Sequence, residues 1–497
     1  MAPPKLESRS RYPHHLSRVC EFWVGEGSKT MKKFRIKISG QDFARLQQLV
    51  LADLPTESGA FALMGTATFP DRVDLIVRRI IEIPKELFEY RDEYHLRVKP
   101  EAINGLIALC ESNRLSAVLC HSHASGLIYS LSDDYGEKRI SEAVQPFVPP
   151  NSPVASLLFS PDGINGRVWL PKARKPVPIS EVVIVDRSIR RITLTSSAQP
   201  LRIDEIYDRQ VLAFGPAGQA MIAQTKVGII GVGGTGSAVA EQLVRLGVRD
   251  VVLIDPDQLD PSNLTRVYGT VASSIHKRGK GGPVLKIDQV ASNLKRINPK
   301  VSLRVIPKNV VLTEAATCLL DRDVLFLCTD EHWGRSVVNQ IAYQYFIPTI
   351  NLGARIAAEE GQISAAVGVV DVIRPDKPCL WCSQFLKADR IAAESMPFKD
   401  RPHLIREGYV ESLDTKTPSV VSITTTVAGQ AVTQFLQLVT DFMGATGEIS
   451  RLNYNVMDGT VRRGSATIPA ECLCKKVRGF GDLMPLPTVA NLDFLYA

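Results

Sequence analysis

Lys226-Val-Gly-Ile-Ile-Gly-Val-Gly-Gly-Thr-Gly236 predicts the fold class of the larger half of this chain. Its first five residues predict a buried strand, and the glycines after them predict a turn into a helix that ends near residue 246. Such a turn lets the backbone approach phosphate oxygens at the N-terminus of a helix, where free N–H groups favour negative charge. The residues expected to contact a nucleotide in this way are Gly231, Gly233, Gly234 and Gly236.

The residues beyond this turn continue an alternation of strands and helices. A strand over residues 250–255 ends in Asp255, which lies 19 residues after Gly236 and is suited to hold a ribose hydroxyl. The further elements that the pattern predicts are a helix at 285–296, strands at 302–307 and 324–328, and a helix at 335–345. The alternation is typical of a doubly wound α/β domain with a mostly parallel sheet. Taken alone, it fits an NAD-dependent oxidoreductase as well as an ATP-binding enzyme.

Five further features in the same half distinguish these two alternatives. They are Tyr207-Asp-Arg209-Gln210, Ser262-Asn263-Leu-Thr-Arg266, Lys286 ahead of Leu294-Lys-Arg-Ile-Asn298-Pro299, Cys328-Thr-Asp330 with Arg335, and Cys379-x-x-Cys382. Their order resembles that of the ThiF/MoeB and ubiquitin-activating enzyme family. Several cations and a carboxylate suit a triphosphate with its magnesium ion, whereas a dehydrogenase has no need for them. The resemblance therefore favours ATP.

The resemblance implies a role for each charged residue. Arg266 and Lys286 would neutralise phosphate charge, Asp330 would hold Mg²⁺, and Asn263 would contact the phosphates. Arg209 would reach into the ATP site of a second subunit, which implies a homodimer. The implied reaction is attack on the α-phosphate of ATP by the C-terminal glycine carboxylate of a ubiquitin-like, β-grasp protein. Its products are an acyl adenylate and pyrophosphate.

Four of the nine cysteines form two close pairs, Cys379 with Cys382 and Cys472 with Cys474. So few cysteines in 497 residues do not make a disulfide framework. The resemblance implies a structural zinc site, although the second pair is Cys-x-Cys where the family usually has Cys-x-x-Cys. Residues 383–471 contain no cysteine, and thioester-forming activating enzymes usually carry their reactive cysteine there. The acyl adenylate is therefore expected to pass to a sulfur donor, a conjugating enzyme or an amine.

The first half of the chain, residues 31–175, has a second candidate site. Residues 116–120 predict a short buried strand that ends at His121. His121 and His123 project to one side of this strand and can meet one metal ion, and Asp133 follows as a third ligand. Three protein ligands leave a position open for water, which is the arrangement of a catalytic zinc site.

With Glu57, in Glu-Ser-Gly-Ala-Phe-Ala-Leu-Met-Gly65, and Ser130, this set resembles the JAMM (JAB/MPN) metallopeptidases. Their motif is a Glu before a Gly-rich apolar strand, then His-x-His-Pro and Ser-x-x-Asp. The resemblance implies a cytidine-deaminase-like α/β domain with zinc on His121, His123 and Asp133. Glu57 would be the general base and Ser130 would stabilise the oxyanion. Family members cleave peptide or isopeptide bonds at the C-terminus of ubiquitin-like proteins.

Two positions depart from the JAMM motif. Ala124 replaces the usual proline, and the segment between His123 and Asp133 is one residue shorter than the common spacing. A loop of the usual length would make Asp134 the ligand, but Leu131 would then occupy the serine position. Asp133 is therefore preferred, and Asp134 is the alternative.

Composition is that of a globular protein, and its charge is unevenly distributed. Residues 1–40 hold nine Lys/Arg and three Asp/Glu, which is most of the net charge of +7, so a nucleic-acid-binding face is not supported. No apolar run reaches the roughly 18 residues of a membrane helix, and we expect a cytoplasmic protein.

The expected parts are a disordered extension at 1–30 with Met31 as a candidate start, a metallopeptidase domain at 31–175, a linker at 176–200, an adenylyltransferase domain at 201–485 and a tail at 486–497.

The combined expectation is a fused JAMM peptidase and ThiF-type adenylyltransferase, as in bacterial ubiquitin-like modification systems. It would process or deconjugate a ubiquitin-like partner with zinc, and would activate its terminal glycine with ATP for conjugation by a conjugating-enzyme homologue. The alternative is sulfur-carrier activation for cofactor or metabolite synthesis, with a sulfurtransferase as the next enzyme. A non-enzymatic ATP-binding scaffold is disfavoured because Lys286 and Asp330 are intact.

Overall fold

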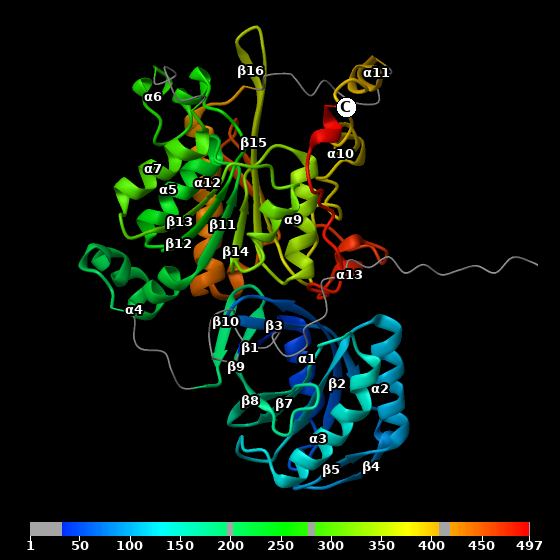
Figure 1. The fold of residues 1–497 in the computed structure, drawn as a ribbon. Coiled ribbons are helices and arrows are strands. Elements are labelled where there is room, and N and C mark those ends of the chain that lie inside the picture. The colour runs from blue at the N-terminus through cyan, green and yellow to red at the C-terminus, as the bar shows by residue number, and fades with distance from the viewer. Residues whose placement is uncertain (1–31, 196–201, 277–283, 407–417, 497) are drawn as a thin grey trace, which may run out of the picture.

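The computed structural model describes residues 32–195, 202–276, 284–406 and 418–496. These residues form two eight-stranded sheets with their own helices, in the lower and upper parts of Figure 1. The expected extension at 1–30 lies outside the described residues. Among the helices that are described, none is long and apolar enough to cross a membrane.

The N-terminal sheet is barrel-like. Its strands run in the order β1-β3-β2-β6-β7-β8-β9-β10, and β1 also pairs with β9. Side chains alternate between the two faces: Ala62 of β2 joins the core that contains α1, whereas Leu63 joins the core that contains α2 and α3. The bounds are β1 Lys33–Ser39, α1 Gly40–Leu51, β2 Gly59–Thr68, β3 Arg72–Glu82, α2 Pro100–Asn113, β6 Ser116–Ser122, α3 Leu131–Val144, β7 Val154–Ser160, β8 Gly163–Trp169, β9 Val177–Val185 and β10 Ile189–Thr193, with a separate hairpin of β4 Phe88–Arg91 and β5 Leu96–Val98.

Residues 176–195 of the linker predicted at 176–200 are mostly part of the sheet, and residues 196–200 lie outside the described residues. Those in the sheet form β9 and β10, which pair antiparallel at one end of the sheet. Residues 182–185 are buried because β9 is covered on both faces beside β1. The basic, proline-containing stretch ahead of them obscured this β-branched run, which is well suited to a strand.

The C-terminal sheet runs in the order β13-β12-β11-β14-β15-β16-β17-β18. The strands from β13 to β15 are parallel, as the alternating pattern predicts, but β16, β17 and β18 add antiparallel. Helices α5, α7 and α12 share one core with this sheet, and α9 lies in the core of the other face. The bounds are β11 Lys226–Ile230, α5 Gly234–Leu246, β12 Asp250–Ile254, α7 Lys286–Ile297, β13 Ser302–Ile306, β14 Val324–Leu327, α9 His332–Gln344, β15 Thr349–Glu359, β16 Gln362–Ile373, α12 Val421–Thr440, β17 Arg451–Asn455 and β18 Thr460–Gly464.

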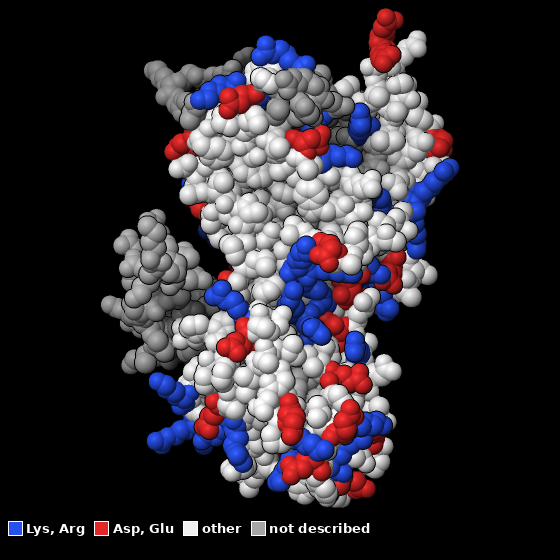
Figure 2. Space-filling view, turned by 90° about the vertical axis from the view of Figure 1, so that its right-hand side faces the viewer, with Lys and Arg blue, Asp and Glu red and all other residues white. Residues whose placement is uncertain are grey.

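A segment near the C-terminus joins the two halves. It follows α13 (Leu473–Val477), and its Gly481 forms a parallel bridge with Thr66 of β2. Arg478 and Arg78 of β3 donate hydrogen bonds to each other's backbone carbonyls. The charged side chains that Figure 2 shows between the two halves include both signs. The two halves also share one buried apolar core, to which the N-terminal half contributes Ala67, Ile76, Val183 and Val185. The halves therefore meet in an interface that is partly apolar and partly polar, and they are not merely tethered.

Residues 486–496, expected as a tail, pack on the C-terminal half. The Val489 N–H donates to the Val311 carbonyl at 2.9 Å, and Leu495 is buried. The Phe494 ring lies 6.4 Å from that of Trp333 on α9. Apolar burial therefore fixes this stretch on α9.

Candidate functional site

The glycine turn connects β11 to α5 at the carboxyl edge of the parallel strands. Gly231 has a φ of 84°, and a Cβ there would lie 2.8 Å from the backbone nitrogen of Thr329. A Cβ on Gly236 would lie 1.9 Å from the Gly231 carbonyl oxygen. Gly233 caps α5 and Gly234 begins it. The close packing requires glycine, and the first-turn N–H groups of α5 provide a site for an anion.

Asp255 and Lys286 lie next to this turn. The Asp255 carboxylate accepts hydrogen bonds from the Val232 N–H at 2.7 Å and the Asp257 N–H at 2.9 Å. Burial raises the pKa of Asp255, and the charge of Lys286 opposes this rise. Lys286 Nζ lies 2.6 Å from Asp257 and 3.7 Å from Asp255. The buried ammonium group of Lys286 therefore lies close to the two carboxylates, Asp255 and Asp257, that follow β12.

Asn263 and Arg266 belong to the short helical turn Pro261–Thr265 and its end. The Asn263 side chain accepts from the Asp260 N–H at 3.1 Å and stabilises this turn. Arg266 donates to the Ser262 carbonyl at 2.9 Å, and its Cδ lies 3.5 Å from where a Cβ on Gly234 would be. The structure thus brings Arg266 over the glycine turn.

Asp330 is exposed in the loop after β14, beside other charged groups. Its charge acts on Arg335, which is 7% exposed and whose Nε has no hydrogen-bond partner. Desolvation, together with the charges of Glu394 and Asp330, raises the pKa of Glu331 to about 7 against a hydrogen bond from Asn309. This edge therefore combines acidic groups with a buried guanidinium.

Glu394 is a residue of this edge that the sequence did not reveal. It comes from α10 (Ala388–Glu394) and accepts hydrogen bonds from the first N–H groups of α9, those of His332 and Trp333. No sequence signal links it to the glycine turn, because only the fold brings these distant segments together. Arg209 lies at the exposed start of α4 (Asp208–Gln224). Its expected place in a partner's site stays a prediction.

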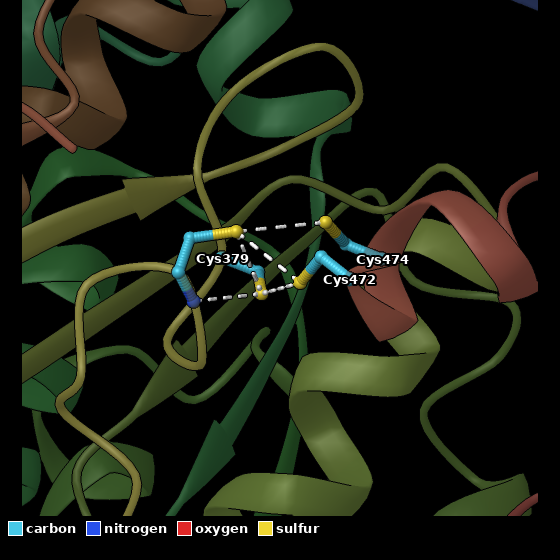
Figure 3. A group of neighbouring side chains, drawn as sticks. Cys379, Cys472 and Cys474 are labelled. Carbon is cyan, nitrogen blue, oxygen red and sulfur yellow. Dashed lines mark hydrogen bonds between the residues drawn. The ribbon is translucent and has the colours of Figure 1, made fainter. Parts of the chain in front are cut away.

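The Sγ atoms of the four paired cysteines lie within 4.8 Å of one another, and Figure 3 shows Cys379, Cys472 and Cys474 turned toward one another. The Sγ atom of Cys472 lies 3.5 Å from that of Cys379 and 3.3 Å from that of Cys382, and Cys382 lies 3.8 Å from Cys474. A tetrahedral zinc ion with Zn–S bonds of about 2.3 Å needs sulfur atoms about 3.8 Å apart. Hydrogen bonding, first of all with Cys474, lowers the pKa of Cys379 below that of an ordinary thiol. The donor set and its spacing fit zinc.

The N-terminal site gathers His121, His123 and Asp133. One ligand atom from each lies within 4.8 Å of the others. Nε2 of His121 lies 3.5 Å from Asp133 Oδ1, and Nε2 of His123 lies 3.3 Å from Asp133 Oδ2. The buried Nε2 of His121 has no hydrogen-bond partner. An orphaned nitrogen facing a second imidazole and a carboxylate fits a metal ion.

Electrostatics at this site follow the same geometry. Burial alone would raise the pKa of Asp133, but the close approach of the two histidines outweighs it and lowers this pKa. Asp133 in turn raises the pKa of His123. Glu57 is 3% exposed, and its Oε1 lies 3.6 Å from His123 Nε2. Burial raises the pKa of Glu57, which suits a carboxylate that accepts a proton.

Asp133 and Asp134 have different surroundings. Ser130 caps α3, and its Oγ lies 2.8 Å from Asp133 Oδ2 in a capping box. Asp134 points to Arg167, with which it forms an ion pair. The shortened loop that contains Ala124 thus brings Asp133, and not Asp134, to the histidines. Ser130 has a capping role here besides the oxyanion role expected of it.

Comparison with known proteins concerns the second half of the chain. Residues 207–476 match the ThiF family. The chain belongs to the ThiF family. This match covers the glycine turn, the charged residues around it and the four converging cysteines, and it ends before Gly481. The family match therefore excludes the alternative that this half is an NAD-dependent oxidoreductase. The N-terminal site lies outside the ThiF region.

Curated relatives of the ThiF region have descriptive names. The molybdopterin-synthase adenylyltransferase of Escherichia coli (strain K12) is 30% identical over 180 residues, which cover 36% of this chain and 66% of that protein. The adenylyltransferase and sulfurtransferase UBA4 of Candida glabrata is 30% identical over 158 residues, covering 31% and 33%. The chain thus spans between about a third and two thirds of these relatives. The crystal structure of Escherichia coli MccB is 19% identical with a TM-score of 0.42, covering 54% of this chain and 72% of that one.

Proposed function

We propose that the ThiF region adenylates the C-terminal carboxylate of a ubiquitin-like sulfur-carrier protein, using ATP and Mg²⁺. The observation that carries this proposal is the convergence of the glycine turn, Asp255, Lys286 and Arg266 at one sheet edge, next to the loop of Asp330. The relatives named as adenylyltransferases support it. Magnesium would be held by Asp330 and by the triphosphate.

The chemistry follows from these charges. An oxygen of the glycine carboxylate attacks the α-phosphorus, and the bond from this phosphorus to the pyrophosphate oxygen breaks. Lys286 and Arg266 neutralise the negative charge that the triphosphate brings and that the leaving pyrophosphate retains. Lys286 Nζ lies 2.6 Å from the exposed carboxylate of Asp257, so an entering phosphate has a cation within reach. Arg209 would complete the site in a homodimer.

Transfer of the acyl group from the adenylate to an external sulfur donor is favoured over formation of a thioester with a cysteine of this chain. Of the cysteines in the described residues, Cys110, Cys120 and Cys318 are buried, and four others form the sulfur cluster. Cys328 faces Gly236, and burial raises the pKa of its thiol, which weakens it as a nucleophile. An external sulfur donor would therefore attack the acyl carbon and release AMP. A relative that combines adenylyltransferase and sulfurtransferase in its name supports this direction.

Pyrophosphate exchange tests the adenylation. Radiolabelled pyrophosphate should enter ATP only when a β-grasp protein ending in Gly-Gly is present, and Asp330→Ala should reduce exchange by at least about 100-fold, because one missing electrostatic contact to a transition state costs that much. Asp71→Ala, at an exposed position of the other half, should leave the rate unchanged. Exchange that persists in Asp330→Ala would overturn the proposal.

We also propose that the N-terminal site is a zinc peptidase that acts on the C-terminal tail of the same partner. The specific observation is that His121, His123 and Asp133 converge beside the buried Glu57. Zinc held by these three residues would supply Lewis acidity and an activated water. Glu57 would accept a proton at Oε1 and deliver it to the leaving amine. Trimming would expose the terminal glycine that the ThiF region activates.

Cleavage of a partner extended beyond its terminal glycine tests this second activity. Glu57→Gln keeps the size of the side chain but removes the base, so cleavage should fall by about 10²–10⁴-fold. Zinc content and adenylation of an already trimmed partner should not change, because the adenylation site is built on the other sheet. Wild-type-like cleavage by Glu57→Gln would rule out Glu57 as the base.

A further inference from the structure

We propose that Glu137 is a positioning residue of the N-terminal metal site, which holds His121 so that Nε2 faces the ligand position. This inference rests on the proposed zinc site and adds a residue outside its sequence motif. Glu137 follows Asp133 by four residues on α3, so both carboxylates lie on one face of the helix. The Glu137 side chain is 7% exposed.

The His121 imidazole lies between these two carboxylates. Its Nε2 is 3.5 Å from Asp133 Oδ1, and its Nδ1 is 3.9 Å from Glu137 Oε1. His123 differs, because its Nε2 faces both Asp133 and Glu57. A carboxylate behind His121 favours the neutral tautomer with the proton on Nδ1, which leaves the Nε2 lone pair for a metal.

Three donors fix the Glu137 carboxylate behind the ring. Arg167 Nε donates to Oε2 at 2.7 Å and Trp169 Nε1 donates to it at 2.9 Å, while Ser156 Oγ donates to Oε1 at 2.5 Å. Tyr129 lies against both the Arg167 guanidinium, at 3.6 Å, and the His121 ring, at 5.8 Å between centroids. The carboxylate therefore cannot rotate away without losing buried hydrogen bonds.

A purely structural role and a positioning role predict different results. If Glu137 only satisfied Arg167 and Trp169, its replacement would change the stability of the metal-free fold and not the metal affinity of the folded site. If Glu137 positions His121, the affinity falls even when the metal-free fold is intact. Residues behind metal ligands typically contribute 10–100-fold in affinity.

Glu137→Gln in the full chain separates these roles. The amide oxygen can still accept from Arg167 and Trp169, and the amide NH₂ then turns toward Nδ1 of His121, so a donor faces a donor. Zinc affinity is measured by chelator competition, and His121→Ala gives the signal that remains from the cysteine site. We expect about 10–100-fold weaker zinc binding at the N-terminal site of the folded protein, in addition to any loss of thermal stability that follows from neutralising the buried pair with Arg167. The control is Glu142→Gln, an exposed position on the same helix.

Trp169→Phe provides a second variant if Glu137→Gln does not fold. It removes one donor to Glu137 and keeps the charge, so a smaller loss of zinc affinity is expected. Unchanged affinity in folded variants would overturn the role of Glu137 and leave the zinc site standing. If His121→Ala holds as much zinc as the wild type, both the role of Glu137 and the zinc site are overturned. Zinc binding that depends on Glu137 without peptide cleavage would support the inference and refute only the peptidase.

Discussion

At the scale of single residues, the surroundings of Asp133 and Asp134 lead to opposite predictions for zinc binding. Asp133 faces both histidines, whereas Asp134 pairs with Arg167 at a half-exposed position. Asp133→Asn should therefore lose the N-terminal zinc, which is about one ion per chain by elemental analysis, and Asp134→Asn should keep it. Loss of zinc in the Asp134 variant alone would show that the loop has the longer register of the JAMM motif.

At the scale of elements, the turn into α5 can form only because Gly236 has no side chain. A Cβ on Gly236 would overlap the Gly231 carbonyl at 1.9 Å, so Gly236→Ala must displace the turn. We expect ATP binding to weaken by more than about 10-fold in calorimetric titration, because the anion site is made of backbone N–H groups. Gly429→Ala is the matched control: it lies within α12, its nearest neighbour would be 3.9 Å away, and alanine favours a helix. ATP binding equal to wild type in Gly236→Ala would contradict the role of this turn.

At the scale of the whole molecule, the segment after the cysteine cluster holds the two halves together. A Cβ on Gly481, whose φ is 55°, would lie 2.2 Å from the Thr66 carbonyl oxygen. Gly481→Ala should therefore break the bridge to β2 and split thermal unfolding into two transitions in scanning calorimetry. Gly459→Ala controls for backbone strain, because its φ is 68° and no atom would lie within 4 Å of its Cβ. One unchanged transition in both variants would mean that other contacts hold the interface.

Features that depend on local pattern could be predicted from the order of residues alone. The glycine run and alternating elements predicted the parallel half of the second sheet, because apolar periodicity and turn residues act over neighbouring positions. Residue types at short spacing likewise predicted His121 with His123, and Cys379 with Cys382. The structure brings each of these two sets of side chains together, whereas metal binding and the roles assigned to them are still predictions.

Features that depend on contacts between distant segments became visible in the folded chain. Residues 182–185 became part of a strand because β1, far away in the chain, offered an edge to pair with. Glu394 caps α9 and Glu137 lies behind His121 through contacts that no local pattern encodes. The spacing from Ser130 already favoured Asp133 over Asp134, and the structure adds that Asp134 pairs with Arg167 of β8. Strand pairing, buried charge and hydrogen bonding act across space, so one sequence read in order does not reveal them.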